Sequence, residues 1–313
     1  MDQHFLSNYL DASEHEIPLD LPTVFGRESE TYLEVGFGSG EFLVQKAIDN
    51  SAKDFLGVEL SVISTEKLLK SLKRELVENV RVLLTDASFC LNNVIPKDSL
   101  SGVYMNFPCP WPKKRHSNRR LNDPNFVLKI GRVLKKGGFF QLYSDSKEFI
   151  SEMSSSVDLT GLFDSVTVEI NPTAGVGTRY ERKWLAMQRE IFRLICRRNS
   201  KAVNCEEDVV NLSHLWVKNI DKSRLDRVAG RSFSSDEMFV KFMGVYRKLD
   251  NEVFLIETLS VDRGYSQRFY ISLSKREEVW LIQLDSQAKP FRTRAVKFAV
   301  RTLSRILGDE SRA

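Results

Sequence analysis

Leu33-Glu34-Val35-Gly36-Phe37-Gly38-Ser39-Gly40 is the stretch that decides the fold. The apolar segment Thr31–Val35 runs straight into a turn with glycine at every second position, and the helix-like segment Glu41–Asp49 follows. Glycine allows such a tight turn and lets the backbone approach a ligand closely. A strand, a glycine turn and a helix in this order predict the first unit of a cofactor-binding α/β domain.

Two features separate this turn from a dinucleotide-binding loop. The spacing is Gly-x-Gly-x-Gly and lacks the wider third interval of the dinucleotide motif. Glu34 stands just before the glycines, where a carboxylate would repel a pyrophosphate but would attract the amino group of a methionine. The turn therefore favours S-adenosylmethionine as the ligand.

Apolar runs continue to alternate with helix-like stretches after this turn, which predicts a parallel sheet with right-handed crossovers. Strands are expected at Thr31–Val35, Phe55–Glu59, Val80–Thr85, Gly102–Asn106 and Phe139–Ser144, and helices at Glu41–Asp49, Ile63–Leu76, Pro124–Leu134 and Lys147–Ser154. Gly137-Gly138 is expected to end the helix that precedes the fifth strand and to open that strand. Further on, we expect a strand at Phe163–Ile170 and a short helix at Tyr180–Met187, and we favour a strand over a helix for Arg189–Arg198.

The pattern changes after a polar segment, residues 199–204, which we interpret as a linker. Apolar or alternating runs predict an antiparallel meander, followed by a helix that ends near Leu307. The runs are Phe239–Tyr246, Val253–Val261, Arg268–Leu273 and Val279–Leu284, with turns at Asp250-Asn251 and Asp262-Arg263-Gly264. We therefore expect an α/β, Rossmann-like class I methyltransferase domain over residues 1–198, with an N-terminal arm over residues 1–30, and a smaller C-terminal α+β domain over residues 205–313.

Acidic residues end successive strands of the predicted sheet. Glu59 follows the glycines by about 20 residues, where a carboxylate can accept both ribose hydroxyls. Asp86 ends the third strand and can bond an adenine amino group. The expected cofactor-binding set is Glu34, Gly36, Gly38, Gly40, Glu59, Asp86, Ala87 and Asn106. The alternative is that each acid only caps the next helix.

Composition excludes several other classes of protein. Four scattered cysteines (Cys90, Cys109, Cys196 and Cys205) and four dispersed histidines predict neither a metal site nor a disulfide framework. No stretch approaches the ~18 apolar residues of a membrane span, and the first twenty residues lack the pattern of a signal peptide. We expect a soluble cytoplasmic protein. The net charge of +4 is too small to identify a partner.

The segment after the fourth strand carries a concentrated positive charge. It begins Met105-Asn106-Phe107-Pro108 and contains three prolines, which stiffen it, and Trp111, which offers a stacking face for a base. Five of the eight residues from Lys113 to Arg120 are lysine or arginine, which suits phosphates. Because it leaves the sheet at the carboxyl ends of the strands, it lies where a methyl acceptor must bind. The alternative is a solvated basic loop.

Here the sequence resembles a known family. Phe-Pro-x-Pro-Trp-Pro-Lys-Lys-Arg-His over residues 107–116, followed by Arg119-Arg120-Leu121, is similar to the motif of the bacterial tRNA (guanine-N7-)-methyltransferases. The resemblance covers roughly residues 30–198 and includes Gly57-Val58-Glu59, Ser144-Asp145 and Thr178-Arg179-Tyr180-Glu181. The C-terminal part resembles the extension of the long form found in some thermophilic bacteria.

The resemblance implies methylation of guanine N7 at position 46, in the variable loop of tRNA, with S-adenosyl-L-methionine as the methyl donor. It implies that Glu34, Glu59 and Asp86 hold the donor, and that Lys113, Asp145, Thr178 and Glu181 hold the target guanosine. The expected substrate-binding set is Trp111, Lys113, Lys114, Arg115, Arg119, Arg120, Asp145, Thr178, Arg179, Tyr180 and Glu181.

Cys109 departs from the family, which usually has an aspartate there that is treated as catalytic. Guanine N7 already carries an in-plane lone pair, so its methylation needs positioning more than proton removal. Our hypothesis is that Cys109 is a neutral spacer and that Asp145 or Glu181 accepts from the guanine N1–H and amino group. Two alternatives stay open: a covalent role for the cysteine, and structural roles in which Asp145 caps a helix and Glu181 pairs with Arg182 or Lys183.

Two rival functions are also open. Asn106-Phe107-Pro108 weakly resembles the loop of amino-group methyltransferases, although its prolines are not adjacent. A tRNA-binding protein that has lost turnover would also explain the cysteine. In the last helix, Arg294, Lys297, Arg301 and Arg305 lie away from the apolar face, where they would contact phosphates or only solvent.

Overall fold

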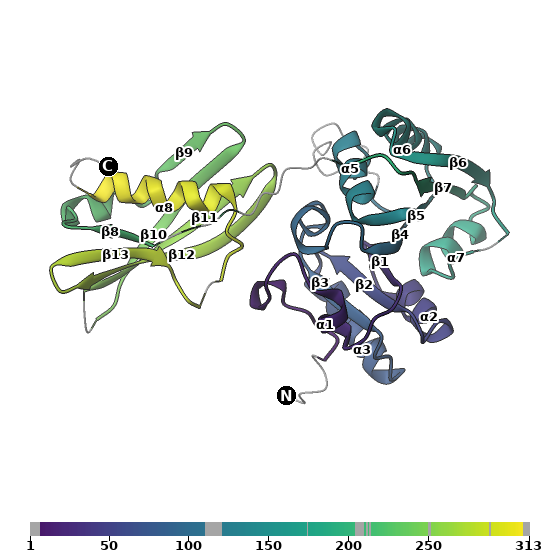
Figure 1. Ribbon diagram of the computed structural model, residues 1–313, viewed down its shortest axis with the longest axis horizontal. Helices are drawn as coiled ribbons and strands as arrows, with labels where there is room; N and C mark the ends of the chain where they lie inside the picture. The colour runs from purple at the N-terminus through teal and green to yellow at the C-terminus, as the bar shows by residue number, and fades with distance from the viewer. Residues whose placement is uncertain are drawn as a thin grey trace. The chain divides into compact units, whose positions relative to one another are not determined.

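The computed structural model of the protein describes residues 7–109, 121–173, 175–203, 210, 212, 214–249, 252–287 and 289–308. The chain divides into two units, Met1–Glu206 and Glu207–Ala313, each with its own sheet (Figure 1).

The first unit is built on a seven-stranded sheet in the order β3-β2-β1-β4-β5-β7-β6. Its strands are β1 (Thr31–Val35), β2 (Asp54–Glu59), β3 (Val80–Leu84), β4 (Leu100–Asn106), β5 (Leu134–Ser144), β6 (Phe163–Ile170) and β7 (Phe192–Arg198). Its helices are α1 (Leu21–Phe25), α2 (Glu41–Asp49), α3 (Val62–Arg74), α4 (Ala87–Phe89), α5 (Pro124–Val133), α6 (Lys147–Thr160) and α7 (Arg179–Ala186). Helices α2 and α3 contact each other, and so do α5 and α6 (Figure 1).

The five parallel strands and the helices between them confirm the Rossmann-like fold expected from the sequence. Every residue of β1 is buried, as a central strand covered on both faces requires. β1 lies between β2 and β4, so the chain order reverses beside it. In open α/β sheets the ligand crevice lies at such a reversal, beyond the carboxyl ends of the strands.

Two details of this unit differ from expectation. Gly137-Gly138 does not end a helix: α5 stops at Val133, and the glycine pair lies inside β5, with Gly137 at φ 77°. The pairing of β4 with β5 shifts register across this stretch, which a glycine with positive φ permits. The favoured strand near Arg189–Arg198 is confirmed as β7, but it runs antiparallel to both β5 and β6, so the sheet is not parallel throughout.

The described part of the N-terminal arm extends the sheet at one edge. Val82 N donates to Asn8 O at 2.8 Å and Leu10 N donates to Val82 O at 2.9 Å. The arm thereby pairs with β3, the outer strand, and buries Leu10 and Leu19.

The second unit is a six-stranded antiparallel sheet in the order β8-β13-β12-β11-β10-β9, with one helix, α8 (Arg294–Leu307). Its strands are β8 (Leu215–Val217), β9 (Ser232–Ser235), β10 (Met238–Arg247), β11 (Val253–Asp262), β12 (Tyr265–Arg276) and β13 (Val279–Leu284). The expected meander is confirmed as β10 to β13. β8, β9 and a 3-10 helix at Lys222–Arg227 were not expected, and the Asp250-Asn251 turn lies outside the described residues.

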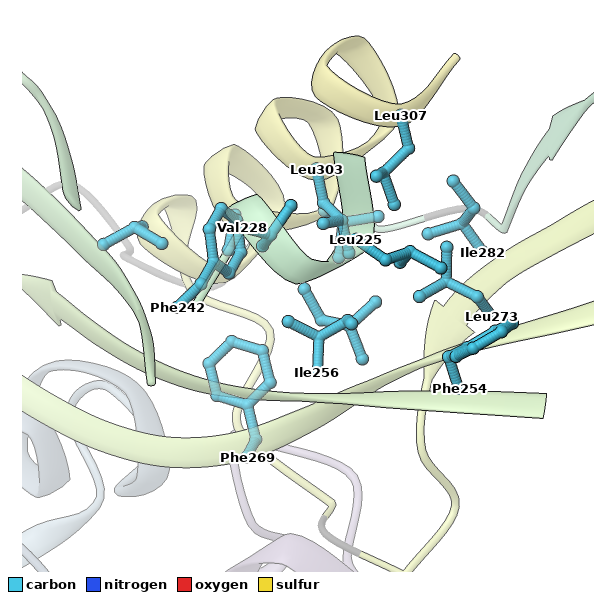
Figure 2. Packing of buried hydrophobic residues seen from close by; sticks show 14 of the residues in the cluster. Leu225, Val228, Phe242, Phe254, Ile256, Phe269, Leu273, Ile282, Leu303 and Leu307 are labelled. Carbon is cyan, nitrogen blue, oxygen red and sulfur yellow. The ribbon is translucent and has the colours of Figure 1, made fainter. Parts of the chain in front are cut away.

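The core of this unit lies between α8 and one face of the sheet. Figure 2 shows Leu303 of α8 directed toward the sheet, from which Phe242, Ile256 and Phe269 point toward the helix. These side chains are fully buried, so the unit has a hydrophobic core of its own.

Candidate cofactor and target site

The glycine loop sits at the carboxyl end of β1. Gly36, Gly38 and Gly40 have φ values of 70°, 55° and 79°, a region that favours glycine. A Cβ added to Gly40 would come within 2.4 Å of Leu68 Cδ1, so this glycine is also required for packing. A Cβ added to Gly36 or Gly38 would have no atom of the described residues within 4 Å. The first two glycines therefore leave open space along the loop.

Glu34 is buried at the entrance to this loop. Glu34 is 1% exposed, and its Oε1 accepts a hydrogen bond from Asn106 Nδ2 at 2.9 Å. Within the described residues, Glu34 Oε2 and Asn106 Oδ1 are buried and have no hydrogen-bond partner. The pKa of Glu34 is raised to about 8, mainly because the side chain is buried; the Asn106 hydrogen bond lowers the pKa in part, and the charge of nearby Glu59 contributes to raising it.

Glu59 connects the end of β2 to the glycine loop. Its Oε2 accepts from Gly38 N at 3.2 Å, and its Oε1 accepts from Leu60 N at 2.8 Å and Ser61 N at 3.1 Å. The N-cap of α3 is Ser61, not Glu59. The contact with Gly38 brings the second expected acid onto the same loop as Glu34.

Asp86 is the N-cap of α4, and its Oδ1 accepts from Phe89 N at 2.8 Å. Asp86 therefore caps a helix through Oδ1, and the cap bond involves only this one of its two carboxylate oxygens among the hydrogen bonds described. Ala87 follows it and is buried at the start of α4.

The described residues suit S-adenosylmethionine at this edge. Two buried acceptor atoms lacking partners, Glu34 Oε2 and Asn106 Oδ1, match the ammonium group at the methionine end of that molecule. The open space beside Gly36 and Gly38 admits a ligand against the backbone. Across the described chain, no cluster of three or more histidine, cysteine or acidic side chains could hold a metal ion. None of its helices has the length and apolar character that crossing a membrane requires.

Asp145 follows β5 and faces Arg189, which the sequence analysis did not place at the site. Arg189 Nη1 donates to Asp145 Oδ2 at 3.2 Å, and the Asp145 side chain is 19% exposed. The Arg189 guanidinium also lies 4.6 Å from the ring centre of Trp184. The alternative that Asp145 caps α6 is wrong, because Ser146 is the cap residue and accepts from Phe149 N.

Glu181 lies in a tightly bonded turn at the start of α7. Its carboxylate accepts from Val176 N at 2.9 Å and from Gly177 N at 2.6 Å. Thr178 caps α7 and accepts from Glu181 N at 3.2 Å. The carboxylate is buried and bonded to its own turn, so its first role is to shape that turn.

The other expected target-binding residues of this segment are more exposed. The guanidinium of Arg179 lies 4.9 Å from the ring centre of Tyr180, and Tyr180 is 39% exposed. Arg182 pairs with Glu41 at 3.0 Å, and not with Glu181 as the structural alternative for that residue supposed. Cys109 is exposed. Trp111, Lys113, Lys114, Arg115, Arg119 and Arg120 lie outside the described residues.

The sequence analysis did not predict that three further residues contribute to the site. Glu41 was read only as the first residue of a helix, Arg182 only as a neighbour of Glu181, and Arg189 only as part of an ambiguous strand. Their partners are 44 to 141 positions away in the chain. No local pattern signals contacts of that separation.

Comparisons with known proteins agree with this geometry. A family model described as a putative methyltransferase matches residues 28–194. The fold and the site thus define an S-adenosylmethionine-dependent methyltransferase.

Curated relatives indicate which kind of methyltransferase the chain resembles. A tRNA (guanine-N(7)-)-methyltransferase of Thermotoga maritima is 34% identical over 91% of this chain and 92% of its own length. One of Aquifex aeolicus is 28% identical over 96% of this chain and 99% of its own length. One of Nitrosococcus oceani is 40% identical over 53% of this chain and 70% of its own length. The chain belongs to the tRNA (guanine-N(7)-)-methyltransferase family.

Proposed function

We propose that this protein transfers a methyl group from S-adenosylmethionine to N7 of the guanine at position 46 of tRNA, in the cytoplasm. The observation that carries the proposal is the buried pair Glu34–Asn106, whose unpartnered acceptors lie beside an open glycine loop. Relatives named as tRNA (guanine-N(7)-)-methyltransferases support the choice of nucleic acid and target atom.

Within this proposal, the chain's own residues position the reactants. Bound S-adenosylmethionine would supply an electrophilic methyl group on a positively charged sulfur. Glu34 and Asn106 would accept from its ammonium group, and Glu59, already fixed against Gly38, would accept from the ribose hydroxyls. Asp86 and Ala87 would lie at the adenine end.

The acceptor needs no base. On transfer, the N7 lone pair would form the new bond to the methyl carbon, and the electron pair of the broken carbon–sulfur bond would stay on the sulfur of the donor. The positive charge thereby moves from sulfur to the guanine ring. A positioned carboxylate near N1–H and the amino group stabilises this developing charge.

Asp145 fits that role better than Glu181. Its side chain keeps some exposure and is oriented by Arg189 through one oxygen, Oδ2. Glu181 already accepts from two backbone amides of its own turn. In this proposal, Asp145 contacts the guanine, Thr178 and Glu181 shape the adjoining wall, and Cys109 is a neutral spacer.

Phosphate contacts complete the proposal. The lysine and arginine residues between Lys113 and Arg120, which follow Trp111, would hold the tRNA backbone next to the site. On α8, Arg294 is bonded to Asp262 at 2.9 Å, whereas Arg301 and Arg305 are exposed and suited to phosphates.

The test is incubation of the purified protein with labelled S-adenosylmethionine and an unmodified tRNA transcript, followed by nucleoside analysis. The expected product is N7-methylguanosine at position 46. A transcript with another base at position 46 is the matched control and should stay unlabelled. Label recovered as N6-methyladenosine, or no label in spite of cofactor binding, would refute the proposal.

A further inference from the structure

One carboxylate connects the glycine loop with the turn that begins α7. Glu41 is the first residue of α2 and directly follows Gly40. Its Oε2 accepts from Arg179 N at 2.7 Å and from Arg182 Nη2 at 3.0 Å. The cofactor loop and the proposed target-binding segment are therefore bonded together, although 138 residues separate Glu41 from Arg179 in the chain.

The turn contacted by Glu41 is internally braced. Arg182 Nη1 donates to Gly177 O at 2.6 Å, and Glu181 accepts from the amides of Val176 and Gly177. With Thr178 accepting from Glu181 N, the turn forms one connected unit. A displacement at Arg179 or Arg182 is thus passed on to the whole turn.

An apolar contact lies directly beside the polar one. Phe42, the next residue of α2, is buried and packs in a cluster with Tyr143, Val176 and Ile191. Tyr143 is in β5, two residues before Asp145. The start of α2 therefore contacts both segments that carry the proposed guanine-binding groups.

We propose that Glu41 is a positioning residue that couples cofactor binding to tRNA binding. The inference rests on the proposed function. A ligand on the glycine loop fixes the start of α2, and the two hydrogen bonds of Glu41 then fix the turn before RNA arrives. Coupling of this kind is reciprocal, so tRNA also tightens cofactor binding. The Glu41 and Arg182 side chains are 37% and 63% exposed, and ion pairs this exposed add little stability.

The experiment measures the affinity of an unmodified tRNA transcript with and without saturating S-adenosylhomocysteine. In the wild-type protein, S-adenosylhomocysteine tightens tRNA binding. Glu41→Ala lowers that tightening factor by about two- to fivefold. Glu41→Gln keeps an acceptor for Arg179 N and lowers it less. Arg182→Ala lowers the factor less in the Glu41→Ala background than in the wild type, because the contact between Glu41 and Arg182 is already absent there and only the Arg182 bond to Gly177 O remains to be lost.

Asp49→Asn is the matched control, since it removes a carboxylate from the other end of α2, where Asp49 accepts from Gln45. Its tightening factor should equal that of the wild type. Should Glu41→Ala fail to fold, Glu41→Gln and Arg182→Ala give the same comparison.

Three results would overturn the inference. The first is an unchanged factor in Glu41→Ala and Arg182→Ala. The second is a wild-type protein whose tRNA affinity ignores S-adenosylhomocysteine. The third is a lower melting temperature with equal losses of both separate affinities and an unchanged factor, which indicates a purely structural residue. Failure of the proposed function is distinguishable, because it appears as a wrong or missing methylated nucleoside in wild-type reactions.

Discussion

Replacing Glu34 by glutamine should make the ligand-free protein more stable and its cofactor binding weaker. The carboxyl group is buried, and its pKa is raised from 4.5 to about 8. Such a difference corresponds to about 5 kcal/mol between the protonation states, which is an upper bound on the cost of burying the charged form. The folded-state pKa of Glu34 lies above the unfolded value. The stability that the neutral carboxyl group contributes is therefore fully present below pH 4.5 and is lost as pH rises through about 8.

Stability provides the first half of the measurement. Glu34→Gln carries no charge at any pH, so its melting temperature should exceed that of the wild type at pH 8, by several degrees at about 2–4 °C per kcal/mol. The difference should shrink toward pH 5, where the wild-type carboxyl is already neutral. A variant less stable than the wild type at pH 8 would contradict the burial argument.

Cofactor binding provides the second half. Binding of an ammonium group requires the carboxylate, so the wild type must release a proton when it binds S-adenosylhomocysteine below pH 8. Its affinity should therefore fall by about 50-fold from pH 8 to pH 6. Removing one partner of a buried charged pair costs about 2–5 kcal/mol, so Glu34→Gln should bind at least about 30-fold more weakly at pH 8.

Calorimetry at pH 6, 7 and 8 would test both expectations. Glu59→Gln is the matched control, since it weakens binding at the same loop but should keep a pH dependence from Glu34, displaced to lower pH because the charge of Glu59 raises the pKa of Glu34. A flat wild-type profile, or a Glu34→Gln affinity within threefold of the wild type, would refute the assignment of the ammonium site.

Three further predictions concern the loop, the target site and the second unit. Gly40→Ala should lower the stability by about 1–3 kcal/mol and abolish cofactor binding, measured by melting and calorimetry, because its Cβ has no room and its φ is positive. Asp145→Ala should reduce turnover by about 100-fold with unchanged cofactor affinity, whereas Cys109→Ala should stay within about threefold; the reverse order in single-turnover assays would exclude the spacer role. Replacing Arg301 and Arg305 by glutamine should make the plot of log affinity for tRNA against log salt shallower by up to about 2, and an unchanged slope would show that α8 contacts no phosphate.

Local sequence determined the part of the site that lies on the parallel strands. The glycines after β1 and the acids at strand ends follow from patterns a few residues long, and strand order then brings Glu34 and Glu59 to one edge. The partners of Asp145 and Glu41 could not be predicted, because they come from α7 and the loop after it, whose approach depends on tertiary packing. The helix end predicted at Gly137 was wrong for a related reason, because glycine at positive φ ends helices and also interrupts strands.

The pairing of the N-terminal arm with β3 has a consequence for self-association. An outer strand with free amides and carbonyls can pair with strands of other molecules, and proteins commonly protect such sheet edges from that pairing. Residues 8–10 occupy part of that edge on β3 through their bonds with Val82. A protein shortened past Leu10 would expose that stretch of β3 and should aggregate more readily, even though every residue of the methyl-transfer site would still be present.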